Sequence, residues 1–343
     1  MRFGLFGSAT ARHGGPDVDS GLGYKQFIDY NIEAEALGYC STFLVEHHFS
    51  GVGQVSASLS LLTWLAAKTR TLRLGTAVLV LPWHNPVLLA EQAATIDLLS
   101  GGRLDFGVGK GYRHNEFSGF CIPIEEGEAR FNECLDVLIK SWTAKERFSY
   151  HGKYWNFADI IVEPPTAQKP HPPMWMAAGS PNSIRQVAER GYNLLLDQFA
   201  SLDAIGERIA LFKAEVEMRG RAFVPAEVAV ARAFYVAKDK ADKEAALEQR
   251  LAAQRHFAAL SKAADGAQSK ASIMAFSDTR EASEEAALYG TPDEIALKLE
   301  RLQNLGADYV LLNGGGLAHE SLRRFARELM PAFADDARMR DVG

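Results

Sequence analysis

One local pattern occurs three times in this 343-residue chain and constrains its fold more than any other feature. A helical stretch ends near a glycine, and a short apolar run begins within a few residues; the glycines are Gly38, Gly191 and Gly306. A glycine after the last helical turn can adopt the left-handed cap conformation, and the apolar run predicts a buried strand. Repeated joints of this kind are typical of alternating βα units. The sequence therefore predicts an α/β fold.

Apolar runs that suit buried strands occur eight times. Most lack the alternation of a half-exposed antiparallel strand, and continuous apolar runs are typical of parallel strands covered on both faces. Eight strands with intervening helices predict one closed (β/α)8 TIM barrel spanning residues 1–343, with an open doubly wound sheet as the alternative. The runs are Phe3–Phe6, Thr42–Val45, Leu72–Leu81, Leu104–Val108, Met174–Ala178, Asn193–Leu196, Val228–Val236 and Tyr309–Leu312.

Two segments between predicted strands are longer than a minimal (β/α)8 barrel requires. Residues 143–172, before the fifth strand, contain closely spaced Gly, Pro and aromatic residues and are predicted to be an inserted hairpin and loop. Residues 238–290, before the eighth strand, are rich in Ala, Lys, Glu and Ser and are predicted to be helical at first. Within them, residues 255–289 are a candidate mobile lid over the C-terminal mouth of the barrel.

Composition narrows the class of protein. The formal net charge is -6, from 37 Lys and Arg against 43 Asp and Glu, whereas a nucleic-acid binder would show clustered cations and a high pI. The cysteines Cys40, Cys121 and Cys134 are too scattered for a disulfide framework or a zinc site. No export signal or 18-residue apolar window is present. We therefore expect a cytoplasmic protein with no metal, membrane or nucleic-acid partner.

A pair of histidines follows the second strand run, where barrels place their active sites. Glu46, His47, His48 and Phe49 stand in succession directly after Thr42–Val45. Because neighbouring side chains on an extended segment point in opposite directions, the two imidazoles are not expected to chelate one metal ion. One is expected to face the mouth and the other to pack outward. The alternative is that both are loop residues bonded to the backbone.

Glycine-rich and small residues follow two further strand runs. Residues 107–111 carry three glycines around Lys110 and form a candidate anion cradle, although the dinucleotide pattern Gly-x-Gly-x-x-Gly is not met. Gly75, Thr76 and Ala77 leave room for a planar group against the backbone, or else allow tight packing in the barrel.

A serine-rich helix start follows the fifth strand run. Gly179 and Ser180 precede Pro181, which suits the first helical position, and Ser183 lies in the first turn. The free N–H groups of that turn, with the two hydroxyls, form a candidate phosphate site. Ordinary N-capping by Ser180 explains the same residues, and the two roles are compatible because they use different donors.

Taken in order, these motifs resemble the bacterial luciferase-like monooxygenase family, whose members are flavin-dependent oxygenases on a (β/α)8 barrel. The match covers nearly the whole chain. The remaining matching segments are Leu74–Val78, Leu81-Pro82, Asn85-Pro86, Ser100–Gly111 and Gly290–Asp293.

The resemblance implies a two-component monooxygenase. Reduced FMN from a separate NAD(P)H:flavin reductase would react with O₂ to give a C4a-(hydro)peroxyflavin, which transfers one oxygen atom to a small apolar substrate. An aldehyde, ketone, terpenoid or aromatic compound is expected as the substrate, and a homodimer as the assembly. The protein would position the flavin, exclude water and relay a proton.

The resemblance also implies roles for individual residues. His47 corresponds to the first histidine of the family's pair and, with His48, is the expected catalytic residue; imidazole titrates near working pH. The Ala77–Val78 bond falls where the family often has a non-prolyl cis peptide under the flavin ring. Gly109 replaces a cysteine beside the flavin, and Lys110 replaces an arginine that binds the FMN phosphate.

The expected site comprises two groups of binding residues. The expected cofactor-binding residues are Glu46, Thr76, Ala77, Val78, Gly109, Lys110, Tyr112, Ala178, Gly179, Ser180, Ser183, Asp197 and Gln198. The expected substrate-pocket residues are Phe49, Trp83 and Phe117.

Two other functions fit the resemblance. One is a deazaflavin (F420)-dependent oxidoreductase of the same superfamily, which transfers hydride without oxygen. The other is a catalytically silent flavin-binding subunit. The His47-His48 pair favours the monooxygenase over both.

Overall fold

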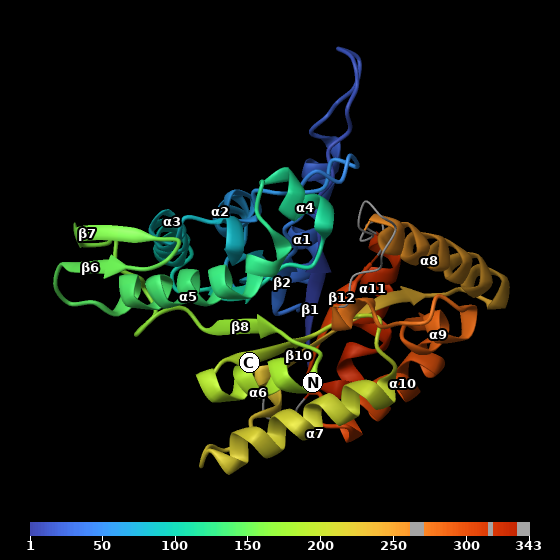
Figure 1. Ribbon diagram of the computed structural model, residues 1–343. Coiled ribbons are helices and arrows are strands. Elements are labelled where there is room, and N and C mark those ends of the chain that lie inside the picture. Colours follow the sequence, from blue (N-terminus) through green and yellow to red (C-terminus); the bar gives the residue numbers. More distant parts are fainter. Residues whose placement is uncertain (261–270, 315–317, 335–343) are drawn as a thin grey trace.

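The computed structural model describes residues 1–260, 271–314 and 318–334, and its centre is a closed barrel of parallel strands surrounded by helices (Figure 1). Each barrel strand pairs in parallel with two neighbours, and pairing of the last strand with the first closes the ring. The predicted (β/α)8 barrel is thus confirmed, and the open sheet is excluded. In ring order the strands are β1 (Arg2–Gly7), β2 (Ser41–Leu44), β3 (Arg73–Thr76), β5 (Leu104–Gly109), β8 (Met174–Ala177), β9 (Asn193–Leu196), β10 (Val228–Val236) and β12 (Tyr309–Asn313).

Each of the eight apolar runs overlaps a barrel strand, with two departures from the prediction. The run Leu72–Leu81 is interrupted: β3 ends at Thr76, the Ala77–Val78 peptide bond is cis, and a short strand β4 (Leu79–Val80) then pairs with β5. A strand β11 (Leu288–Gly290), which the sequence analysis missed, pairs with β10 outside the ring. Three residues are too few to show a periodic pattern.

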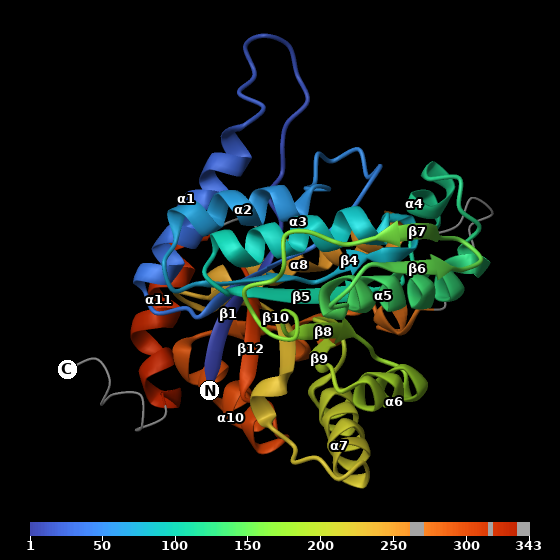
Figure 2. The ribbon, with the colours of Figure 1, turned by 90° about the vertical axis from the view of Figure 1, so that its left-hand side faces the viewer.

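The helices lie outside the strands, and Figure 2 shows α1, α2 and α3 side by side over one face of the barrel. The three predicted helix–glycine–strand joints are confirmed: Gly38, Gly191 and Gly306 have φ angles of 92°, 73° and 94°. In each, the residue after the glycine donates its N–H to the carbonyl five residues earlier, which closes the helix end. The helices are α1 (Leu22–Ala36), α2 (Ser58–Lys68), α3 (Pro86–Leu99), α4 (His114–Gly119), α5 (Gly127–Thr143), α6 (Pro181–Arg190), α7 (Leu202–Met218), α8 (Lys240–Leu260), α9 (Arg280–Glu285), α10 (Pro292–Asn304) and α11 (His319–Glu328).

The interior of the barrel is filled by side chains. Phe43, Trp175 and Tyr309 pack edge to face, with ring centroids 5.7 to 6.3 Å apart, and Leu195 and Leu311 complete this layer. A larger apolar layer lies between the strands and the helices. Because the centre is packed, the strand ends are where ligands can bind, and barrel enzymes use the C-terminal ends.

Both insertions are present. Residues 143–172 contain an antiparallel hairpin of β6 (Phe148–His151) and β7 (Asn156–Ile160). Residues 238–290 begin with the long helix α8, on the opposite side of the barrel from the hairpin in Figure 1. Part of the candidate lid, residues 261–270, lies outside the described residues.

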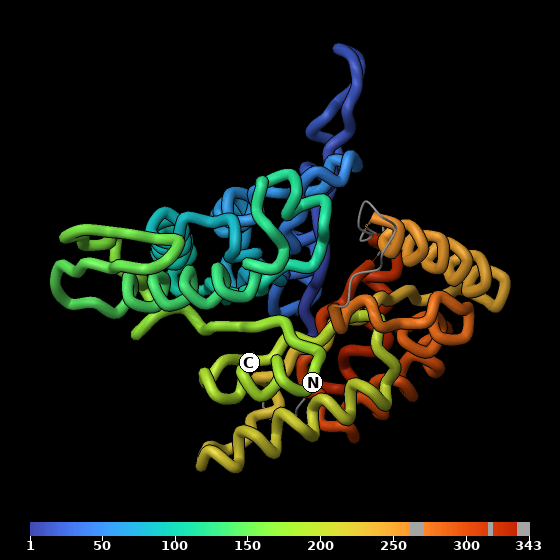
Figure 3. Tube along the Cα trace, in the orientation of Figure 1, coloured from blue at the N-terminus to red at the C-terminus, as the bar shows by residue number. Residues whose placement is uncertain are grey.

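A long loop joins β1 to α1 and extends away from the barrel (blue, Figure 3). Its base pairs with the chain after β2, since Ala11 N–H donates to Gly53 O at 2.8 Å and Val55 N–H donates to Ala9 O at 3.0 Å. His47 N–H in turn donates to Val55 O at 3.3 Å. The loop therefore borders the histidine pair. Among the described helices, none has the length and apolarity that crossing a bilayer requires.

Candidate active site

The two adjacent histidines face two different carboxylates at the C-terminal end of β2. His47 Nδ1 lies 2.9 Å from Glu116 Oε1, and His48 Nε2 lies 2.8 Å from Glu46 Oε1. The imidazoles therefore point apart, as the extended segment predicts. In the described part of the chain, no three His, Cys, Asp or Glu side chains are arranged so that they could hold a metal ion.

Glu46 is the centre of a fully occupied hydrogen-bond cluster and is only 2% exposed. Its Oε1 lies 2.8 Å from the Nε2 atoms of both His48 and His84 and accepts the Trp83 indole N–H at 3.2 Å; Oε2 accepts the Val80 N–H at 2.8 Å. Burial raises the pKa of Glu46, but the hydrogen bonds from His48 and His84 outweigh it and the pKa falls to about 2. The carboxylate thus ties β2 to the segment after the cis peptide. His84 was missed in the sequence analysis.

Glu116 is the centre of a second, differently built cluster and is 1% exposed on α4. It accepts from His47 Nδ1 and, at 3.0 Å, from the His48 backbone N–H, while Arg113 Nη1 lies 3.7 Å away. Burial lowers the pKa of His47, Glu116 raises it and Arg113 lowers it, and the net shift is downward. With its Nδ1 proton held by Glu116, neutral His47 presents the lone pair of Nε2.

Arg113 is a buried guanidinium with unused donors. It is 2% exposed, and its Nε and Nη1 atoms make no hydrogen bond to residues 1–260, 271–314 or 318–334. The guanidinium carbon lies 5.2 Å from the ring centroid of Phe257 in α8 and 5.9 Å from that of Tyr112. The sequence analysis missed both Arg113 and Glu116. The signal was a pair of opposite charges directly after the glycine-rich loop.

Small residues allow β5 to approach the β3–β4 segment closely. A Cβ atom on Gly107 would stand 1.8 Å from Thr76 O, and one on Gly109 would stand 2.5 Å from Val78 Cγ2. Thr76 Oγ1 donates to Gly107 O at 2.7 Å and accepts the Gly107 N–H at 2.8 Å. A side chain at position 109, such as that of cysteine, would therefore have to displace Val78.

The start of α6 is capped by its own serines. Ser180 Oγ accepts the Ser183 N–H, and Ser183 Oγ accepts the Ser180 N–H, which forms a capping box. Ala178, just before them, donates its N–H to Leu195 O at 3.2 Å. Predicted N-capping is confirmed here. Pro181 has no N–H and the capping box uses those of Ser180 and Ser183, so the Asn182 N–H is the first-turn donor left for a ligand.

Lys110 and Arg208 are the two cationic side chains considered for a phosphate at the start of α6, and only Arg208 lies beside Gly179. Lys110 is exposed, and its Nζ lies 3.3 Å from Glu128 Oε2. Arg208, from α7, was not predicted; its guanidinium carbon lies 3.3 Å from where a Cβ on Gly179 would stand. Its Nη1 donates to Asp197 Oδ2 at 2.7 Å.

The residues after β9 are engaged within the protein. Asp197 Oδ1 accepts the N–H groups of Phe199 and Ala200 at 2.8 and 2.9 Å. Gln198 Oε1 accepts the Asn313 side-chain amide at 3.1 Å. Both predicted residues thus lie at the C-terminal mouth, between β9 and β12.

Aromatic rings surround His48. Phe120, which was not predicted, stacks on Trp83 at a centroid distance of 5.1 Å and lies 4.9 Å from the rings of both His48 and Phe49. Phe49 is 57% exposed, whereas Phe117 is buried with its ring 5.3 Å from Trp83. The cluster forms an apolar rim beside the histidine pair.

Described parts of the second insertion contact three strand ends. Phe257 lies 6.2 Å from Tyr112 after β5, and Phe276 stacks on Phe199 after β9 at 4.6 Å. Ser272 Oγ lies 2.6 Å from where a Cβ on Gly179 would stand, after β8. These residues cover one side of the mouth.

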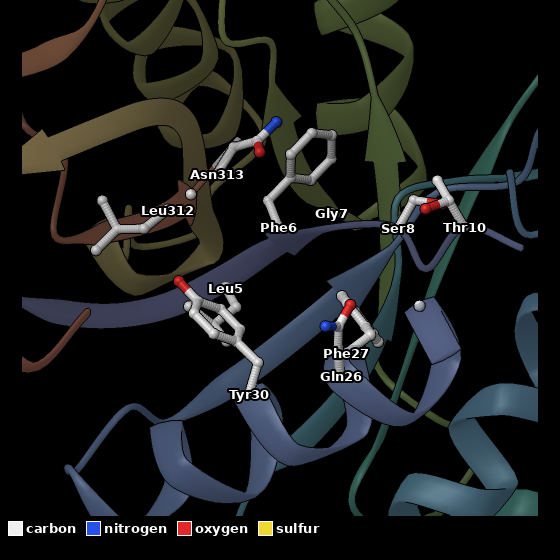
Figure 4. Close-up of a pocket in the computed structure, with 12 residues that line it drawn as sticks. Leu5, Phe6, Gly7, Ser8, Thr10, Gln26, Phe27, Tyr30, Leu312 and Asn313 are labelled. Atoms are coloured by element: carbon white, nitrogen blue, oxygen red, sulfur yellow. The ribbon is translucent and has the colours of Figure 1, made fainter. Parts of the chain in front are cut away.

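Two cavities lie apart from the histidine pair. One of about 250 Å³ lies between β1, β12 and α1, where Phe27 and the buried Tyr30 hydroxyl reach toward the strands (Figure 4). The other, about 730 Å³, lies at the N-terminal strand ends around the Arg73–Asp105 ion pair. Neither His47 nor His48 lines either cavity.

Comparison with known proteins decides the family. The family model described as luciferase-like monooxygenase matches residues 1–309. The chain belongs to the luciferase-like monooxygenase family. This luciferase-like chain is 28% identical over 332 residues to the oxygenase component of a flavin-dependent trigonelline monooxygenase from Acinetobacter baylyi, covering 91% of each chain.

Further relatives agree with this assignment. An FMNH(2)-dependent dimethylsulfone monooxygenase from Pseudomonas putida is 27% identical over 350 residues, covering 92% of this luciferase-like chain and 93% of the relative. The crystal structure of monooxygenase RslO1 from Streptomyces bottropensis superposes with a TM-score of 0.84 and 26% identity, covering 97% of this chain and all of that one. A relative from Kineococcus radiotolerans, 29% identical over 205 residues, is named as an F420-dependent glucose-6-phosphate dehydrogenase; the match covers 55% of this chain and 59% of the relative.

Proposed function

We propose that this chain is the oxygenase component of a two-component FMNH₂-dependent monooxygenase. A separate NAD(P)H:flavin reductase would supply the reduced flavin, and one oxygen atom of O₂ would enter a small organic substrate. The observation that carries the proposal is the buried His47–Glu116 pair at the end of β2. It provides a neutral imidazole whose Nε2 has no hydrogen bond to any residue that the structure describes.

The residues at the strand ends fit FMN. The Asn182 N–H and the hydroxyls of Ser180 and Ser183 at the start of α6 suit the phosphate, and Arg208 lies beside them. The close approach of Gly109 to Val78 forms a wall of small side chains that suits a flat ring. When bound, the reduced flavin supplies the activation of O₂.

The protein's own part is positioning and proton movement. His47 Nε2 would accept or return a proton at the reacting centre, while Glu116 holds the proton on Nδ1 and orients the ring. Glu46 would act indirectly, because its hydrogen bonds fix His48 and the segment after Val78. The apolar rim of Phe49, Trp83 and Phe120 would receive the organic substrate.

We also propose that residues 255–289 act as a lid. Phe257, Ser272 and Phe276 each contact the end of a different strand, so the described parts of this segment already reach across one side of the mouth. Closure there would exclude water from the reaction.

We propose a homodimer that uses α2 and α3. Trp64 on α2 and Leu88, Leu98 and Leu99 on α3 are exposed apolar side chains on two adjacent helices. Leu99→Asp should convert the dimer to a monomer in analytical ultracentrifugation. Leu297→Asp, an equally exposed leucine on α10, is the matched control and should leave the dimer intact.

His47→Ala tests the proposed function. With a flavin reductase, NADH and ¹⁸O₂, a screen of aldehydes, ketones and aromatic compounds should give a product labelled with ¹⁸O. The variant should lose about 100-fold or more in turnover, because it lacks the proton relay. FMN affinity should stay within about threefold. Unchanged turnover would remove His47 from the mechanism.

A titration with the deazaflavin F420 distinguishes the proposed monooxygenase from the main alternative, an F420-dependent oxidoreductase. If the protein binds F420 and not reduced FMN, and incorporates no ¹⁸O into any substrate, hydride transfer replaces oxygen transfer as the function. FMN binding without turnover across the screen would instead favour a silent subunit.

A further inference from the structure

Arg113 carries buried hydrogen-bond donors that the described part of the chain does not use. Its Nε and Nη1 atoms are buried without an acceptor there, although an unsatisfied buried donor is costly. Glu116, its ion-pair partner at 3.7 Å, already accepts from His47 and from the His48 backbone. We therefore expect a bound ligand to supply the hydrogen-bond acceptor for these guanidinium donors.

The surroundings of Arg113 define what that acceptor can be. Phe257 and Tyr112 flank the guanidinium, and His47 is close enough for Arg113 to lower its pKa. The donors thus lie in a buried place between two aromatic rings and the Glu116–His47 pair. A planar group with a delocalised negative charge along one edge matches a planar guanidinium in such a place.

We propose that Arg113 binds the anionic N1–C2=O edge of reduced FMN and makes the protein select reduced over oxidised flavin. Reduced flavin is an anion near neutral pH with its charge at this edge, whereas the oxidised ring is neutral. The inference rests on the proposed function. It explains how an oxygenase that receives reduced flavin from a separate reductase could avoid occupation by the oxidised form.

The other cations near the mouth are less suited to this role. Lys110 is exposed and paired with Glu128, and Arg208 is paired with Asp197 beside the α6 start, where the phosphate is proposed to bind. Arg113 contacts the Glu116–His47 pair directly, so it serves the reacting end of the cofactor.

Anaerobic binding measurements test this proposal without relying on turnover. Dissociation constants for oxidised and reduced FMN would be determined for the wild type, Arg113→Met and Arg113→Lys. The wild type should prefer reduced FMN by about tenfold or more, which corresponds to a midpoint potential about 30 mV above that of free FMN. Arg113→Met should abolish most of this preference, and Arg113→Lys should retain part of it.

The controls separate binding from folding. Arg327→Met, at an exposed arginine on α11, should keep the wild-type preference, and melting temperatures identify any variant that is unfolded. If Arg113→Met kept the full preference, or weakened both redox forms equally, the proposal would be wrong. Equal loss for both forms of FMN but none for riboflavin would instead assign Arg113 to the phosphate.

The outcomes also separate this proposal from the proposed function. A wild type that binds only F420 contradicts the FMN assignment, whatever Arg113 does. A wild type that oxygenates substrate with FMNH₂ but binds both redox forms equally leaves the function standing and overturns the role of Arg113.

Discussion

Glu46 and Glu116 are both almost fully buried beside one histidine of the same pair, yet their surroundings differ. Glu46 accepts four hydrogen bonds from donors on two neighbouring segments, and its cluster is complete. Glu116 shares its cluster with the Arg113 guanidinium, whose Nε and Nη1 atoms have no hydrogen-bond acceptor among the described residues. A buried polar network that is fully satisfied stabilises structure, whereas one with open positions is prepared for a ligand or a proton. We therefore propose that Glu46 serves stability and that Glu116 serves the chemistry of His47.

The largest expected difference between the two clusters is in stability. Glu46→Gln should destabilise the fold by about 3 kcal/mol, because two imidazoles, an indole and a backbone N–H lose a charged acceptor. Glu116→Gln should cost less, about 1 kcal/mol, because fewer donors depend on it. Chemical denaturation at pH 7 measures both values. Equal costs would contradict the distinction drawn here.

The pH dependence of stability follows from the lowered pKa of Glu46. A carboxyl group with a pKa of about 2 in the folded state and 4.5 as its ordinary value stabilises the fold above about pH 4.5. This contribution is lost as the pH falls from there toward 2. The gap in melting temperature between wild type and Glu46→Gln should therefore narrow between about pH 5 and pH 3.

A structural feature of this protein could be predicted from the sequence when a few neighbouring residues determine it. The eight barrel strands and three glycine caps were predictable, because continuous apolar runs and left-handed caps are local features. The break in Leu72–Leu81 was not, since an apolar run does not reveal where pairing changes from one neighbour to the next. Strand β11 is too short to show any period.

The site was predictable only in part. His47 and His48 were visible because they directly follow a strand run. Their carboxylate partners could not be paired with them, since Glu116 is 69 residues away from His47 in sequence and meets it only through the barrel. Arg208 joins the α6 start from the following helix, and no spacing within the sequence indicates that contact.

The next largest expected difference is in FMN affinity, between variants of the two cations near the proposed phosphate site. Arg208→Ala should weaken FMN binding about tenfold, because a charge-assisted contact beside the α6 start is lost. Lys110→Ala should change it less than about twofold, since an exposed lysine paired with a glutamate contributes little. Riboflavin, which lacks the phosphate, should bind both variants as it binds the wild type. The reverse ranking of the two variants would assign the phosphate to Lys110.

The smallest expected effect is on the acidic limb of the plot of turnover against pH. This effect distinguishes the Glu116 cluster from the Glu46 cluster most directly. The limb should report protonation of His47, whose pKa burial places below its ordinary value of 6.5. Because Glu116 raises this pKa and Arg113 lowers it, Glu116→Gln should move the limb to lower pH and Arg113→Met should move it to higher pH. Glu46→Gln acts on His47 only as a more distant charge, so its shift should be smaller than that of Glu116→Gln. Turnover under saturating reduced flavin from pH 5 to 8 gives all four profiles. Shifts in the same direction for Glu116→Gln and Arg113→Met would show that the limb does not belong to His47.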